Sequence, residues 1–272
     1  MSRKLLKLSY SWLDESDTHF VTCCVCDGEN EQEIKNSFEL NGKEFSIKYC
    51  RADDLIYLSP QPGKKYQNAL YNHPTYYQGV DDMYGLLIED KKSEAIAKLR
   101  IGEIRKYAPK ATSILEIGCA YGHLLSEALS NSFLSVKGIE FSDKAVEICA
   151  KKGLDVVSAD ANLLGYKGGQ KYDIVASYST LEHLENPNEF LMAIKNFLKP
   201  TGKLILRVPD TDSVLGPPFS LLDHLWHFTR DSIEKILKKN GFIIEDIFES
   251  GTFYARNGKI LKNMTIIAFL KI

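Results

Sequence analysis

The sequence predicts an α/β fold: a mostly parallel, seven-stranded sheet with helices on both faces. Two observations support this prediction. From about residue 91, short apolar runs alternate with longer segments whose apolar residues recur at helical spacing. Glycine and proline stand at the joints between these segments, where they end helices and open turns. Strands and helices that alternate in this way are typical of a parallel sheet covered on two sides.

Seven apolar runs are the expected strands. They cover residues 113–117, 136–140, 154–157, 172–177, 203–208, 242–248 and 264–270. The intervening segments carry helix signals. Pro109 ends one expected helix, Pro187 suits the first turn of another, and Thr229 suits the N-cap of a third.

The chain before this alternation divides into two parts. Residues 1–60 contain short β-type runs and turns, so we expect a small β-rich segment there. Residues 61–90 form a tyrosine-rich connector, which either folds over a pocket as a lid, with Tyr77 and Tyr84 as contacts, or simply packs against the sheet. Residues 91–272 then form the main α/β domain.

Charge and hydropathy exclude several classes of function. The 272 residues include 34 Lys and Arg against 36 Asp and Glu, a net charge of −2, which gives no support to a nucleic-acid binder with a broad basic field. No stretch reaches the ~18 consecutive apolar residues of a membrane helix, and the N-terminus lacks a cleavage signal. We therefore expect a cytoplasmic protein with reduced cysteines and no membrane partner.

The turn after the first expected strand is the most informative segment. Residues 115–123 read Leu-Glu-Ile-Gly-Cys-Ala-Tyr-Gly-His, a strand that enters a glycine-containing turn and then a helix. Such a turn lets a ligand approach the backbone and the helix N-terminus. The spacing does not fit the G-x-G-x-x-G dinucleotide fingerprint, and Glu116 suits a cationic ligand better than a pyrophosphate.

Acidic residues follow the next two strands. Glu140 closes the second strand, where a carboxylate can accept hydrogen bonds from both hydroxyls of a ribose, and the neighbouring Phe141 could lie against an adenine ring. Asp160 follows the third strand and could accept from the adenine amine. Taken alone, acids after strands are often helix N-caps or solvated loop residues, and Asp160 by itself favours a structural role over a ligand contact.

These motifs, in this order, resemble those of the class I S-adenosylmethionine-dependent methyltransferases, a family with a Rossmann-like fold, over about residues 91–250. The resemblance implies that Glu116 orders the glycine turn and the methionine amino group, and that Glu140 holds the ribose. Ala120 stands where the family usually has a second glycine. The resemblance assigns the remaining contacts with S-adenosylmethionine to Gly118, Cys119, Ala120, Gly122, Phe141, Asp160, Ala161 and Ser177.

Three histidines are candidates for a general base. A sulfonium methyl is already activated, so a base is needed only when the acceptor is protonated, as a hydroxyl is. His183 follows the fourth strand and ranks first, His227 second and His224 third; each could instead cap or pack a helix. Members that methylate nucleic-acid bases carry a Pro-Pro motif after strand four, which residues 177–180 lack, so we expect a small-molecule acceptor.

The N-terminal segment resembles the zinc ribbon that precedes the methyltransferase domain in some sugar methyltransferases. Cys23, Cys26 and Cys50 fit its spacing, but Asp53 replaces the fourth cysteine. We therefore expect a degenerate, metal-free ribbon, with zinc as the less favoured alternative. The ribbon favours O-methylation of a sugar or sugar-linked metabolite. An NAD-dependent oxidoreductase on a related fold and a non-catalytic partner subunit are the alternatives.

Overall fold

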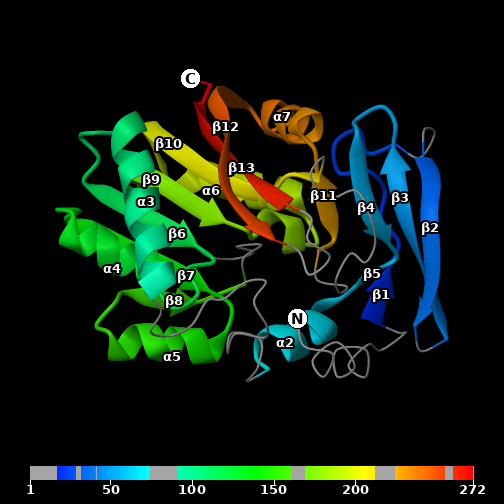
Figure 1. Ribbon diagram of the computed structural model, residues 1–272, viewed down its shortest axis with the longest axis horizontal. Helices are drawn as coiled ribbons and strands as arrows, with labels where there is room; N and C mark the ends of the chain where they lie inside the picture. The colour runs from blue at the N-terminus through cyan, green and yellow to red at the C-terminus, as the bar shows by residue number, and fades with distance from the viewer. Residues whose placement is uncertain are drawn as a thin grey trace.

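A computed structural model describes residues 17–28, 32–40, 42–73, 91–160, 169–211, 224–254 and 260–271. Its centre is a seven-stranded sheet with the order β12-β13-β10-β9-β6-β7-β8 (Figure 1). The strands are β6 (Ser113–Ile117), β7 (Ser135–Glu140), β8 (Val156–Ser158), β9 (Tyr172–Tyr178), β10 (Leu198–Pro209), β12 (Phe242–Tyr254) and β13 (Ile260–Leu270). The predicted seven-stranded α/β fold is confirmed.

The strand order creates a switch point in the middle of the sheet. The chain begins at β6, moves outward to β7 and β8, and then returns to β9 on the other side of β6. All these strands and β10 run parallel, whereas β13 is antiparallel to both of its neighbours. In such sheets, ligands bind beyond the carboxyl ends of the strands at the switch point. Here that place lies beyond the carboxyl ends of β6 and β9.

Helices cover both faces of the sheet because successive strand residues point to opposite sides. They are α3 (Lys91–Tyr107), α4 (His123–Ser130), α5 (Asp143–Lys151), α6 (Pro187–Phe197) and α7 (Arg230–Lys239). In β6, Ile114 packs with residues of α3 and α4, while the next residue, Leu115, packs with residues of α6 and α7. Ile174 and Val175 of β9 divide in the same way. The alternation that marks a sheet buried on both faces is therefore realised strand by strand.

A smaller antiparallel sheet lies beside the central one, with the order β11-β4-β3-β2, of which β2, β3 and β4 are the blue strands of Figure 1. It consists of β2 (Gln32–Leu40), β3 (Lys43–Cys50), β4 (Leu55–Ser59) and β11 (Trp226–Phe228). Strand β11 comes from the main domain, and its Trp226 and Phe228 pair with Tyr57 and Leu55 of β4. One continuous core joins Tyr57 to residues of α6 and α7. The N-terminal segment is thus packed into the main domain.

The start of the connector is ordered around a short helix. Strands β1 (Thr18–His19) and β5 (Gln61–Pro62) pair, and α2 (Lys64–Tyr71) follows directly. Residues 74–90, with the proposed lid contacts Tyr77 and Tyr84, lie outside the described residues. Within the described ranges, no helix is long and apolar enough to cross a membrane.

Candidate active site

The turn after β6 has the backbone geometry of a ligand cradle. Gly118, Ala120 and Gly122 all have positive φ angles, of 77°, 46° and 71°. A Cβ atom on Gly118 would lie 2.4 Å from Oγ1 of Thr180, which follows β9. The turn therefore lies against the segment that leaves the neighbouring strand, and a side chain at Gly118 would push the two apart.

Glu140 fastens this turn from the end of β7. One carboxylate oxygen accepts a hydrogen bond from the backbone N–H of Ala120 at 2.8 Å, and the other accepts from those of Phe141 and Ser142, both at 2.9 Å. The side chain is almost fully buried. Because three N–H groups converge on it, the carboxylate is held in one orientation, and it holds Ala120 in a backbone conformation that only glycine adopts easily.

Glu116 is a buried carboxyl with unfilled hydrogen-bonding capacity. Only 3% of the residue is exposed, and its Oε2 has no hydrogen-bond partner among the described residues. Burial raises its pKa to about 8, although the positive charge of Arg100 partly offsets this effect. A buried acid without a partner is costly unless a ligand completes it. Its position beside the glycine turn suits a ligand with a positively charged amino group.

Two arginines beside Tyr178, of which Arg100 also acts on Glu116, carried no sequence signal. The guanidinium of Arg100, in α3, lies 4.0 Å from the ring centroid of Tyr178, and that of Arg207, in β10, lies 5.9 Å from it. Burial lowers the pKa of Arg207 to about 10. Both residues lie in elements that are recognised in the sequence only by the spacing of their apolar residues, so no motif distinguishes these two arginines. Only the fold brings them to the switch point.

The three candidate histidines come together although two chain segments supply them. His183 ends a short 3-10 helix, η2 (Leu181–His183), whereas His224 lies two residues before β11 and His227 lies within it. The ring centroids of His183 and His224 are 4.6 Å apart, and those of His224 and His227 are 6.0 Å apart. A backbone hydrogen bond from Leu225 to the carbonyl of Glu182, at 2.8 Å, joins the two segments.

In this histidine cluster, His183, His224 and His227, the surroundings of the last two favour neutral imidazoles. Burial lowers the pKa of His224 well below its usual value and that of His227 to about 3, and the nearby His183 adds to both shifts. Glu182 is 1% exposed, and its Oε1 lies 3.9 Å from Nε2 of His183. No sequence motif marks this acid, even though it precedes His183 directly.

Tyr71 connects the histidine cluster to the cofactor side of the site. Its ring lies edge-on to that of Phe141, with centroids 6.0 Å apart, and edge-on to that of His183 at 6.1 Å. The backbone N–H of His183 also donates to the carbonyl of Thr180, the residue that contacts the glycine turn. The candidate base and the candidate adenine neighbour therefore border the same space.

The remaining expected contacts have mixed surroundings. Asp160 forms an ion pair with Lys64 of α2 at 3.2 Å, and Ser177 donates from Oγ to the carbonyl of Ile117 at 3.1 Å, which joins the ends of β6 and β9. The Cys119 side chain is buried in a small apolar cluster beneath the turn, so only its backbone can face a ligand. Ala161 lies outside the described residues.

Comparison with known proteins identifies the family. A family model described as a methyltransferase domain matches residues 89–247, more than half of the chain. The chain belongs to the class I methyltransferases. This confirms the family predicted from the glycine turn and the acids, and with it S-adenosylmethionine as the cofactor. The site fits this cofactor, because Glu116 offers a buried carboxyl whose Oε2 has no hydrogen-bond partner among the described residues, next to a glycine turn that Glu140 holds in place.

Curated relatives cover parts of this methyltransferase. It is 30% identical over 155 residues to the mitochondrial ubiquinone biosynthesis O-methyltransferase of Schizosaccharomyces pombe, which covers 49% of this chain and 56% of the relative. It is 34% identical over 119 residues to the ubiquinone biosynthesis O-methyltransferase of Caulobacter vibrioides, covering 41% and 46%. An uncharacterised protein of Methanocaldococcus jannaschii is 28% identical over 158 residues, covering 56% and 74%. The match thus spans about half the length of these ubiquinone enzymes.

Solved structures share the fold of the methyltransferase. A protein from Pyrococcus horikoshii superposes with a TM-score of 0.58 at 17% identity, covering 72% of this chain and 98% of its own. An S-adenosylmethionine-dependent methyltransferase from Clostridium acetobutylicum gives 0.54 at 15% identity, covering 73% and 97%. At such identities the likeness establishes the fold alone.

Proposed function

We propose that this methyltransferase methylates a hydroxyl group of a small molecule, with a sugar or sugar-linked metabolite as the favoured acceptor. The observation that carries the proposal is the cluster of His183, His224 and His227, which Thr180 joins to the glycine turn and Tyr71 joins to Phe141. A hydroxyl acceptor must lose its proton as the methyl arrives, and a neutral imidazole is a suitable base for that step, whereas a thiolate needs none.

Each protein group has a defined task in this proposal. Bound S-adenosylmethionine supplies a methyl group on a sulfonium, which reacts without further activation. Glu140 holds the turn that receives the cofactor. The carboxylate of Glu116 pairs with the positively charged amino group of the cofactor. His183 accepts the proton of the acceptor hydroxyl, and the buried Glu182, 3.9 Å away, stabilises the imidazolium that forms. The protein's other contribution is to align the acceptor and exclude water.

Two further observations support the choice of acceptor. The curated relatives from Schizosaccharomyces pombe and Caulobacter vibrioides are O-methyltransferases, which favours oxygen as the acceptor atom. The choice of a sugar as acceptor is based on the ribbon-like N-terminal segment, whose sheet includes His227 through β11. The family match gives the NAD-dependent alternative no support. Glu140 keeps its full set of hydrogen bonds, which argues against a non-catalytic partner subunit.

The proposal is tested by screening methyl glycosides, nucleotide sugars, catechols and primary amines for release of S-adenosylhomocysteine. With a hydroxyl acceptor in hand, His183→Ala should lower turnover by ~10²–10⁴-fold while its affinity for S-adenosylhomocysteine stays within about twofold. His19→Ala, in β1, is the matched control and should turn over normally. Activity confined to amines would refute the proposal. Normal turnover of His183→Ala would remove His183 as the base and direct attention to His227.

A further inference from the structure

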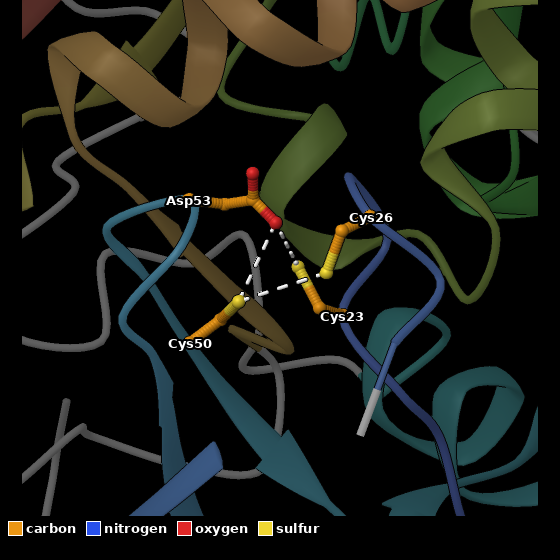
Figure 2. A group of neighbouring side chains, drawn as sticks. All are labelled: Cys23, Cys26, Cys50 and Asp53. Carbon is orange, nitrogen blue, oxygen red and sulfur yellow. Dashed lines mark hydrogen bonds between the residues drawn. The ribbon is translucent and has the colours of Figure 1, made fainter. Parts of the chain in front are cut away.

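Three cysteines and one aspartate converge at one end of the smaller sheet (Figure 2). Cys23 and Cys26 lie in the turn before β2, Cys50 ends β3, and Asp53 lies in the turn that leads to β4. We propose that Cys23, Cys26, Cys50 and Asp53 bind one Zn²⁺ ion, and that this ion fastens the N-terminal sheet to helix α7. The sequence alone favoured a metal-free ribbon, because an aspartate stands in place of the fourth cysteine.

The separations among the four side chains are those of a tetrahedral zinc site. Sγ of Cys26 lies 3.8 Å from that of Cys50. Oδ2 of Asp53 lies 3.2 Å from Sγ of Cys23 and 3.4 Å from Sγ of Cys50, and all four ligand atoms lie within 4.8 Å of one another. With Zn–S of about 2.3 Å and Zn–O of about 2.0 Å, a regular tetrahedron has S···S edges of about 3.8 Å and S···O edges of about 3.5 Å. The three measured separations match these edges, and the 4.8 Å limit on the others lets one ion reach all four atoms with small side-chain shifts.

The local backbone also suits thiolates. The N–H of Val25 points to Sγ of Cys23 at 3.4 Å, a contact that stabilises a negatively charged sulfur more than a thiol. The two ligand pairs have the same three-residue separation, Cys23 with Cys26 and Cys50 with Asp53, so each turn offers two donors to one centre. All six cysteines of the chain are free. The donor set of three thiolates and one carboxylate selects zinc over magnesium or calcium.

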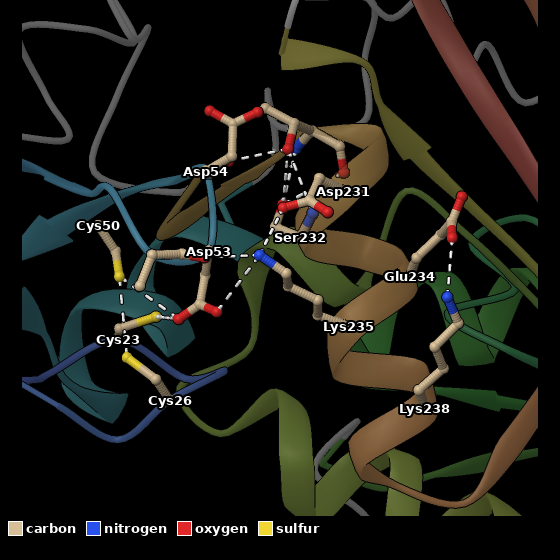
Figure 3. A network of polar contacts seen from close by, with 12 residues as sticks. Cys23, Cys26, Cys50, Asp53, Asp54, Asp231, Ser232, Glu234, Lys235 and Lys238 are labelled. Atoms are coloured by element: carbon tan, nitrogen blue, oxygen red, sulfur yellow. Dashed lines mark hydrogen bonds and ion pairs between the residues drawn. The ribbon is translucent and has the colours of Figure 1, made fainter.

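Charge balance explains why Asp53 can replace a cysteine. Zinc binding releases three protons from three thiols and leaves a centre with a net charge of −2. Helix α7 places Lys235 against it, with Nζ 3.8 Å from Oδ1 of Asp53 and 2.6 Å from the carbonyl of Ala52 (Figure 3). One carboxylate oxygen of Asp53 thus faces the sulfurs while the other faces a lysine. A cysteine would have no second atom to offer to α7.

The same loops make further contacts with the main domain. Lys239 of α7 and Asn188 of α6 both donate to the carbonyl of Cys24, at 3.3 and 2.8 Å. Oγ1 of Thr229, the N-cap of α7, donates to the carbonyl of Asp54 at 2.8 Å. Because β4 begins directly after Asp54 and pairs with β11, an ion in this centre fixes the loops from which that pairing starts.

The test begins with metal content. The full chain, purified without chelator, should contain about one zinc per molecule by elemental analysis, and Cys26→Ser should contain less than a tenth of that. Cys24→Ser is the matched control, since this buried thiol lies outside the group of four. The zinc content of this variant should equal that of the wild type. Asp53→Cys should retain one zinc. Its cobalt-substituted form should show stronger sulfur-to-metal charge transfer than wild type, in the ratio of four thiolates to three.

Chelation keeps the proposal testable if Cys26→Ser does not fold. Removing zinc from the wild-type chain should lower its Tm, and adding Zn²⁺ should restore it. Amide hydrogen exchange should rise in β4 and β11 but not in β7 and β8, which lie far from the centre. Wild-type protein that neither contains zinc nor takes it up, or Cys26→Ser that keeps a full equivalent, would overturn the site. Exchange that rises equally in all four strands, or in none, would overturn the fastening role.

Discussion

Replacement of Glu116 by glutamine tests how the site prepares for a cationic ligand. The carboxyl is 3% exposed, and its Oε2 has no hydrogen-bond partner among the described residues. Its pKa is raised to about 8 by burial, so at pH 7 the free protein keeps this group mostly protonated. A ligand ammonium can pair with it only after the proton leaves. Cofactor binding should therefore release a proton.

The size of the effect follows from the shift. Each pKa unit is worth about 1.4 kcal/mol, so at pH 7, 2.5 units above the ordinary value of 4.5, the buried acid costs on the order of 3 kcal/mol of folding free energy. The unfolded chain ionises from about pH 4.5 and the folded chain only near pH 8, so this cost grows as the pH rises between the two. Glu116→Gln, which cannot ionise, should be more stable at pH 7 by up to that amount.

The assay is calorimetric titration with S-adenosylhomocysteine, which carries the same amino group without the sulfonium. The wild-type Kd should fall about tenfold from pH 6 to pH 7, because ionisation of Glu116 becomes easier while the ligand's amino group stays protonated. Glu116→Gln should bind more weakly and with no such slope, while urea unfolding reports its added stability. A wild-type Kd that changes less than twofold over this range, or a glutamine variant with the same slope, would refute the reasoning.

Three further predictions follow from the same geometry. Glu140→Ala removes the acceptor of three backbone hydrogen bonds and should weaken S-adenosylhomocysteine binding by about 1.5–3 kcal/mol in the same titration; an unchanged Kd would contradict this. Gly118→Ala should lower both Tm and ligand affinity, and adding Thr180→Ala should restore only part, since the positive φ angle still disfavours alanine. His227, with a pKa lowered to about 3, stays neutral when the unfolded chain gains a proton, so it costs up to about 1.4 kcal/mol of stability per pH unit below 6.5. His227→Gln should therefore flatten the pH dependence of urea unfolding between pH 6.5 and 4, and equal slopes would exclude this role.

The sequence predicted those features that depend on local pattern. Apolar periodicity is set by burial on one or two faces, so the strands and helices of the central sheet could be found without a structure. The glycine turn was likewise recognisable, because Gly118 and Gly122 need backbone angles that few other residues adopt. The histidine cluster was named residue by residue, but its closeness depends on two segments that only the fold brings together.

Features that depend on distant pairing could not be predicted. Strand β11 is three residues long and has no hairpin turn to announce it; its partner β4 lies some 170 residues earlier. Lys235 is one of several lysines on a polar helix face, and nothing in its neighbours marks it as the one beside Asp53. Arg100 likewise precedes the glycine turn without any motif. In each case, tertiary packing selects the residue, and one-dimensional spacing does not record it.

Strand β11 limits how this enzyme can be divided or recombined. A chain cut back to residues 91–272 would keep the strand that carries His227 but lose β4, the neighbour with which it pairs. Trp226 and Phe228, now buried, would then face water, and such a fragment should aggregate. Grafting a foreign N-terminal segment would meet the same obstacle unless it supplied a matching edge. Any exchange of one part must therefore preserve the pairing of β4 with β11, which ties the sequence of the N-terminal sheet to that of the main domain.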